Sequence, residues 1–167
     1  PSAPGKRSRF VRSEEVAALQ VEAALATDVD LFACGIGAPR EVVARAKALG
    51  KTTVALVGSR RHALAALEVG VDLLVAQGTD AGAHTGPIGT FSLVPQVVDV
   101  AGDVPVVAAG GVATGRHIAA ALALGAQGVW MGTAWLTSTE HAAKLTPTLV
   151  NKLLAAGSED TVISRAD

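Results

Sequence analysis

The sequence has 167 residues, of which half are apolar and 17% are charged, as expected of a folded globular domain. Its 14 Lys and Arg residues nearly balance 15 Asp and Glu residues, and no basic stretch is interleaved with aromatic residues. This pattern excludes the usual nucleic-acid-binding surface and favours a small-molecule partner. We expect one domain over residues 1–167.

A single cysteine, Cys34, cannot form an internal disulfide, and the opening residues lack the basic, apolar and small-residue order of a signal peptide. The longest apolar runs are interrupted by glycine well before the roughly 20 residues needed to span a bilayer. These features predict a cytoplasmic protein without a membrane segment. The polar, basic opening without an initiator Met leads us to expect a fragment of a longer polypeptide.

Helices and strands are predicted to alternate along the chain. A first helix is expected over residues 13–26, because Ser13 followed by carboxylates suits a helix N-terminus. Short apolar, β-branched runs predict strands at residues 30–34, 52–57, 72–76, 104–109 and 128–131. Ala- and Leu-rich stretches predict intervening helices at residues 39–49, 61–69 and 115–124, and a last helix is expected at 148–156.

Three of the predicted helices end in a glycine, namely Gly50, Gly70 and Gly125, and a predicted strand follows each within a few residues. Glycine suits a left-handed conformation at a helix C-terminus. Strands that alternate with helices and are buried on both faces form a parallel sheet, either a barrel or an open doubly wound sheet. One extended segment, residues 77–90, breaks the regular spacing and is interpreted as a functional loop.

This loop leaves the C-terminal end of a predicted parallel strand, where ligands bind in α/β folds. Its glycines at positions 78, 82, 86 and 89 allow close approach of the backbone to a ligand and positive φ angles. His84 lies among them, and an imidazole is the natural acceptor of an acidic C–H proton at physiological pH. A flexible loop with a solvated histidine is the alternative interpretation.

Two other interpretations of this loop are weaker. Asp80, His84 and Ser92 lack the G-x-S-x-G elbow of a hydrolase, and three residues so close in sequence rarely form a catalytic triad. Asp80 and His84 also lack further metal ligands, because the other histidines fall in predicted helices. No metal site is expected.

Two later strands end in segments that suit a phosphate. One predicted strand ends at Gly110 and Gly111, whose backbone N–H groups can bind phosphate oxygens, and Thr114 is placed to cap the next helix. The following strand ends at residues 129–133, with a small-residue pair that offers N–H donors and a hydroxyl. Because barrel enzymes commonly bind a phosphate between the loops after strands seven and eight, these segments predict a phosphate-bearing cofactor.

Several segments of this sequence resemble the nitronate monooxygenases, formerly called 2-nitropropane dioxygenases. The resemblance runs over roughly residues 50–140 and rests on residues 76–78, 81–86, 93–99, 108–115, 120–126 and 131–133. It implies the C-terminal part of a flavin-binding (β/α)₈ TIM barrel, with strands four to eight present and the N-terminal strands supplied by the same or another chain. Where the family loop usually has Glu and a second Gly, this chain has Asp80 and Ala83.

By this resemblance the protein is expected to be an FMN-dependent oxidoreductase. The implied FMN-binding residues are Gln77, Gly82, Gly110, Gly111, Trp130, Met131, Gly132 and Thr133. His84 aligns with the catalytic base, which accepts a proton from a nitroalkane. The flavin and dioxygen then convert the nitronate to a carbonyl compound and nitrite.

Two alternatives remain open. The same scaffold carries FMN-dependent enoyl-thioester reductases that use NAD(P)H, and related members act on coenzyme A thioesters in steroid breakdown. A non-catalytic FMN- or phosphate-binding module is the other alternative. Without the N-terminal strands, we do not expect these 167 residues to bind FMN tightly.

Overall fold

The computed structural model describes residues 14–35, 37–82 and 84–162, which form an α/β fold with five parallel strands in the order β1-β2-β3-β4-β5. The strands are β1 (Leu31–Cys34), β2 (Thr52–Val57), β3 (Leu73–Gln77), β4 (Val106–Ala109) and β5 (Gly128–Trp130). All five predicted strands are confirmed, with ends that differ by at most two residues.

Helices separate the strands along the chain. The predicted helices correspond to α1 (Glu14–Leu25), α2 (Arg40–Ala48), α3 (Arg60–Val69), α5 (Gly115–Ala123) and α7 (Pro147–Ala155). The glycines that end three of them have positive φ, as predicted, at 73° for Gly50, 80° for Gly70 and 94° for Gly125. Among the residues that the structure describes, no helix combines the length and apolar character needed to cross a membrane.

Helix α4 (Thr90–Ala101) is absent from the sequence-based prediction, as are the short α6 (Thr139–Ala142) and the 3-10 turns η1 (Thr133–Trp135) and η2 (Ser158–Asp160). α4 contains Pro95, and its β-branched residues have modest helix propensity. It nevertheless forms a helix with Leu93, Val94 and Val97 fully buried. Tertiary packing outweighs local propensity here.

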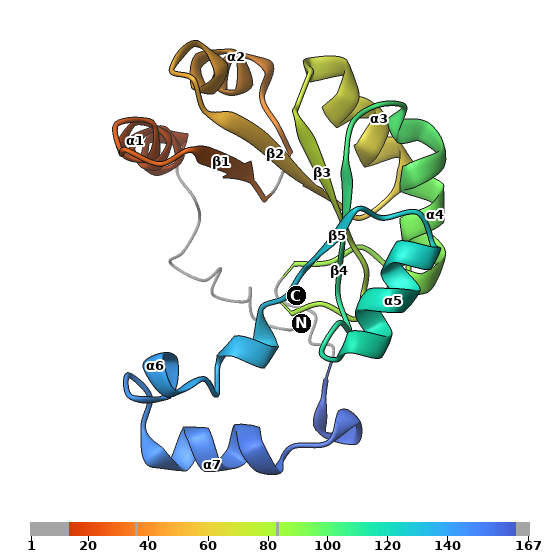
Figure 1. Ribbon diagram of the computed structural model, residues 1–167. Coiled ribbons are helices and arrows are strands. Elements are labelled where there is room, and N and C mark those ends of the chain that lie inside the picture. The colour runs from red at the N-terminus through yellow and green to blue at the C-terminus, as the bar shows by residue number, and fades with distance from the viewer. Residues whose placement is uncertain (1–13, 36, 83, 163–167) are drawn as a thin grey trace, which may run out of the picture.

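The sheet is covered on one face by helices α2, α3, α4 and α5, while α6 and α7 lie away from it (Figure 1). Successive side chains of β2 point to opposite faces. Ala55 and Val57 belong to the larger core beneath the helices, whereas Val54 packs with Val75 and Ala109 on the other face. Burial on both faces explains why these strands read as continuous apolar runs.

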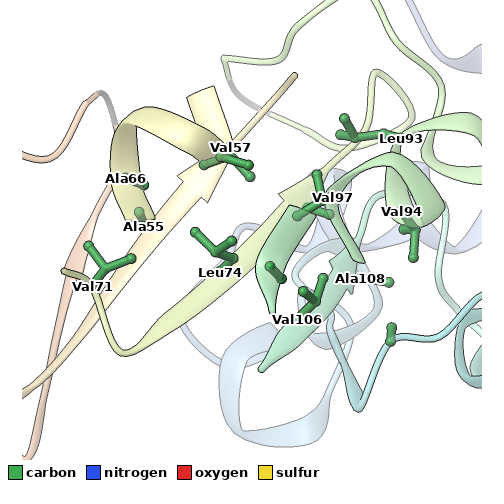
Figure 2. Packing of buried hydrophobic residues seen from close by; sticks show 14 of the residues in the cluster. Ala55, Val57, Ala66, Val71, Leu74, Leu93, Val94, Val97, Val106 and Ala108 are labelled. Carbon is green, nitrogen blue, oxygen red and sulfur yellow. The ribbon is translucent and has the colours of Figure 1, made fainter. Parts of the chain in front are cut away.

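Figure 2 shows the larger core, in which Leu74 of β3 lies among residues from β2, β4 and the covering helix α4. Its largest members, including Leu74, Leu93 and Val97, are fully buried. This core fixes the strands against the helices and thereby sets the positions of the loops that leave the strand ends.

Within the described part of the chain, β1 and β5 each pair with a single strand. Apolar residues lie at both edges, because Leu31 in β1 is 43% exposed and Trp130 in β5 is 42% exposed. The free N–H and C=O groups of an edge strand can pair with a further strand. The sheet therefore has two edges at which it can be extended.

The core predicts a specific stability difference. We expect Leu74→Ala to lower the free energy of unfolding by about 2–5 kcal/mol. The leucine side chain is fully buried, so its truncation leaves a cavity in the core. Leu64→Ala on α3 is the matched control, since that leucine is 43% exposed and its truncation leaves no closed cavity. Urea denaturation of the complete polypeptide measures both, and equal losses for the two variants would contradict the described packing.

Candidate functional site

The carboxyl ends of β3, β4 and β5 lie side by side. In the parallel register, Gln77 pairs with Ala109, and Ala109 pairs with Trp130. The loop that carries His84, the glycine pair after β4 and the segment after β5 therefore begin at one edge of the sheet. The structure thus brings together the three segments that the sequence analysis selects.

The loop between β3 and α4 is closed at its base by backbone hydrogen bonds. Thr79 N–H donates to the carbonyl of Ile88 at 2.9 Å, and Ala81 N–H donates to the carbonyl of Gly78 at 3.0 Å. The amide of Gln77 also donates to the carbonyl of Gly82, with Nε2 and O 3.3 Å apart. The bond from Thr79 to Ile88 joins the two ends of the loop, and the other two bonds stabilise its outgoing side.

Asp80 makes the contact that connects this loop to the next helix. Its Oδ2 accepts the backbone N–H of Thr90 at 2.8 Å. This N–H holds the pKa of the Asp80 carboxyl below its usual range, the Thr90 side chain adds to the effect, and desolvation opposes it. The Thr90 hydroxyl and the Gly78 N–H both donate to the carbonyl of Ala109, at 3.2 and 3.0 Å.

The glycines of this loop serve a purpose that the sequence analysis did not assign. None of the four has positive φ, so that expectation is wrong for this loop. A Cβ at Gly78 would overlap the backbone of Thr90, and one at Gly86 would lie 2.6 Å from the carbonyl oxygen of Gly58. These two glycines permit close packing of backbone on backbone, while Gly82 has open space around its Cα.

The glycine pair after β4 does require glycine conformations. Gly110 has φ 102° and Gly111 has φ 69°, both in the left-handed region that disfavours side chains. A Cβ at Gly110 would lie 2.7 Å from Oγ1 of Thr90, and one at Gly111 would lie 3.2 Å from Cβ of Asp80. The pair therefore packs directly against the corner that Asp80 and Thr90 form.

Backbone N–H groups at the ends of β4 and β5 remain available to a ligand. In the described part of the chain, no acceptor is found for the N–H groups of Gly110, Gly111, Val112, Met131, Gly132 and Thr133. Gly111, Gly132 and Thr133 are also exposed to solvent. A phosphate needs several such donors, so the two strand ends fit a phosphate group chemically.

His84 is exposed and lines a cavity of about 440 Å³ together with Gln77 and Thr85. The rest of the wall is largely apolar and includes Leu56 and Val57 of β2. Such a cavity, apolar with a few polar groups, suits a small organic ligand. His62, in the first turn of α3, lines it too, and the sequence analysis treats this residue only as part of a helix.

The glycine pair lines a second cavity. A cavity of about 230 Å³ is lined by Asp80, Gly110, Gly111 and His117. His117 is engaged locally, because its Nδ1 accepts the N–H groups of Ala113 and Thr114 at 3.0 and 3.2 Å, where α5 begins. Residues 130–133 adjoin the glycine pair through the strand register and line neither cavity.

Metal-binding side chains are scattered in this fold. His62 and His117 lie in the predicted helices α3 and α5, and His141 lies in α6, for which no helix bounds were predicted. Within residues 14–35, 37–82 and 84–162, no group of three or more His, Cys, Asp or Glu side chains is arranged to hold a metal ion.

Comparison with known proteins agrees with these features. The model of the nitronate monooxygenase family matches residues 9–167. A putative monooxygenase of Mycobacterium tuberculosis is 50% identical over 147 residues, which are 87% of this chain and 39% of that protein. A Rhodococcus jostii dehydrogenase, named for a hydroxy-methyl-oxo-octahydroindene-carboxyl-CoA, is 42% identical over 126 residues, or 75% of this chain and 35% of that protein.

The solved structure of FabK from Thermotoga maritima superposes with a TM-score of 0.81 and 34% sequence identity, over 91% of this chain and 48% of that one. The chain thus spans less than half the length of these relatives. Since the family model matches nearly every residue, the chain belongs to the nitronate monooxygenase family.

Proposed function

We propose that this chain forms the half of an FMN-dependent oxidoreductase that binds the flavin phosphate and supplies the base, and that the complete protein oxidises nitroalkanes and alkyl nitronates with dioxygen. The observation that carries the proposal is the pairing of two features at one sheet edge. One is the set of backbone N–H groups after β4 and β5 that have no acceptor in the described part of the chain, and the other is His84 on a largely apolar cavity.

The phosphate of FMN is proposed to bind between the ends of β4 and β5. Gly110 and Gly111 contribute backbone N–H groups, and Met131, Gly132 and Thr133 contribute further donors. The positive φ angles at Gly110 and Gly111 favour glycine, and glycine has no Cβ to obstruct a ligand. The exposed side chain of Trp130 begins the second segment.

The flavin ring and the substrate are proposed to meet at the cavity that His84 lines. Gln77 lies at the end of β3, and its amide is oriented by the carbonyl of Gly82, 3.3 Å away. Both residues are candidates for contact with the ring. Leu56 and Val57 provide an apolar wall to the same cavity, which excludes water from a bound nitroalkane.

Each group in this arrangement has one task. A ring nitrogen of His84 accepts the α-proton of a neutral nitroalkane, because a neutral imidazole is a suitable base for an acidic C–H. A nitronate has already lost that proton and does not need the base. When bound, FMN supplies the electron acceptor, and dioxygen is the second substrate that reoxidises it.

The rest of the barrel is proposed to complete the fold. In this proposal the described strands are the fourth to the eighth of a closed (β/α)₈ barrel, and further strands pair with those edges of β1 and β5 that have no partner strand among the described residues. The chain covers only 39% of its Mycobacterium tuberculosis relative, which leaves enough sequence for the remaining strands. Those strands contribute the other flavin contacts.

An enoyl-thioester reductase is the second candidate. It is favoured by the 42% identity to the coenzyme A-linked dehydrogenase of Rhodococcus jostii and by the superposition on FabK. In that case NAD(P)H, and not a nitronate, would deliver electrons to the flavin, and His84 would act as an acid or would orient the thioester. The nature of the reductant separates the two candidates.

The two candidates are separated by anaerobic reduction of the complete, FMN-loaded polypeptide, followed by flavin absorbance. We expect a nitronate to reduce the flavin and NADPH not to do so. In His84→Ala, reduction by the neutral nitroalkane should slow by about 10²–10⁴-fold, while reduction by the preformed nitronate changes little, because only the first step needs a base.

His141→Ala in α6 is the control and should match the wild type with both compounds. Rapid reduction by NADPH alone would instead assign the protein to the reductases. Tight FMN binding without reduction by either donor would indicate a non-catalytic binding module.

The phosphate site is tested separately by Gly110→Ala. The new Cβ would lie 2.7 Å from Oγ1 of Thr90 and 2.9 Å from N of Ala81, in a backbone conformation with φ 102°. We expect the dissociation constant for FMN, measured by quenching of flavin fluorescence, to rise by at least about 10-fold, equivalent to about 1.4 kcal/mol.

Gly102→Ala is the matched control, because Gly102 has φ 59° but follows α4 at the opposite end of β4, with no atom within 4 Å of its Cβ position. This substitution should also strain the backbone but leave FMN affinity unchanged. Equal losses of affinity in the two variants would contradict a phosphate site at Gly110.

A further inference from the structure

Asp80 lies where the His84 loop, helix α4 and the glycine pair meet. Its carboxylate accepts the N–H of Thr90 at 2.8 Å, and its Cβ is 3.2 Å from the Cβ position of Gly111. Asp80 also lines the cavity of about 230 Å³ that contains the glycine pair, whereas His84 lines the separate cavity of about 440 Å³. Asp80 therefore contacts helix α4 and the glycine pair, and it lies four residues from His84 in the same loop.

We propose that Asp80 is a positioning residue, whose carboxylate fixes the loop that carries His84 against helix α4 and the glycine pair. The inference rests on the proposed function only in naming His84 as the base and Gly110 and Gly111 as phosphate ligands. The contacts of Asp80 themselves are features of the fold.

Two hydrogen bonds beside Asp80 close the loop that carries His84. The hydrogen bond from Thr90 to Asp80 brackets residues 81–89, among which His84 lies. Next to it, Thr79 N–H donates to the carbonyl of Ile88, so two bonds join the outgoing and returning strands of the loop. Loss of the carboxylate removes the one side-chain bond of this pair and lets the loop separate from α4.

The N-cap residue of helix α4 supplies no capping side chain. Its N-cap residue is Gly89, which has no side chain, and its first turn contains no acidic residue. Orphan N–H groups and the helix dipole at this end are stabilised by a negative group. Asp80 supplies that group from the preceding loop, so the start of a 12-residue helix and the position of the loop are coupled.

Asp80 and Thr90 also lie against the glycine pair. The Thr90 hydroxyl and the Gly78 N–H share the carbonyl of Ala109, the residue just before Gly110. Because a Cβ at Gly110 would meet Thr90, and one at Gly111 would meet Asp80, any shift of this corner changes the space beside the pair. Asp80 thus influences the phosphate donors and the base together.

The test compares Asp80→Ala, which removes the acceptor, with Asp80→Asn, whose amide oxygen can still accept the N–H of Thr90. Asp99→Ala on the exposed face of α4 is the matched control. Each variant is made in the complete polypeptide. Three readouts are compared: amide hydrogen exchange at Ala81 and Thr90, the ¹H–¹³C NMR signal of the His84 ring, and kcat and KM for a nitroalkane and its nitronate.

We expect Asp80→Ala to speed amide exchange at Thr90 by at least about 10-fold, to shift the His84 ring signal and to lower kcat for the nitroalkane about 10-fold more than for the nitronate. A factor of ten corresponds to about 1.4 kcal/mol. Asp80→Asn should restore all three readouts to within about 3-fold, and Asp99→Ala should not change them. A purely structural role would lower both kcat values equally.

Unchanged exchange at Thr90 and an unchanged His84 signal in a folded Asp80→Ala variant would overturn the proposal. If that variant does not fold, Thr90→Pro removes the same bond from the donor side, since proline lacks the N–H and is favoured at the first helical position. Proline at position 90 has no amide to exchange, so exchange is then measured at Ala81, together with the His84 ring signal. A wild type that reacts with no nitro compound would refute the proposed function, while the exchange and NMR readouts still decide the role of Asp80.

Discussion

The parallel register of β3, β4 and β5 is the constraint on which the proposed site depends. Because Gln77 lies opposite Ala109, and Ala109 opposite Trp130, three segments distant in sequence begin at one edge of the sheet. The buried Leu74 and the helices above it hold this register. The loops then need only short-range bonds, such as that between Asp80 and Thr90, to take their positions.

Sequence patterns predict the strands and helix ends that depend only on neighbouring residues. The apolar strands, the glycines at positions 50, 70 and 125 and the position of Thr114 at the N-cap of α5 all follow from neighbouring residues, and the structure confirms them. Helix α4 is missed because Pro95 and β-branched residues argue against it, and only burial of Leu93, Val94 and Val97 stabilises it. That burial depends on the sheet, which a local pattern does not contain.

The candidate site likewise has features that the sequence predicts and contacts that only the structure shows. Its loops and His84 are visible in the sequence because glycines and a histidine follow an apolar strand. The bond from Thr90 to Asp80 joins residues ten positions apart through a folded loop, and no spacing rule predicts it. Likewise, Gly78 and Gly86 pack against Thr90 and Gly58, contacts that require the three-dimensional fold. The function of those glycines is visible only in the structure.

The central claim is that these residues hold the flavin phosphate after β4 and β5 and place His84 beside the flavin ring. A crystal structure of the complete polypeptide with FMN tests it most directly. The account predicts phosphate oxygens within hydrogen-bonding distance of the N–H groups of Gly111 and Gly132, with His84 facing the ring. A phosphate bound elsewhere, or a His84 ring turned away from the flavin, would contradict it.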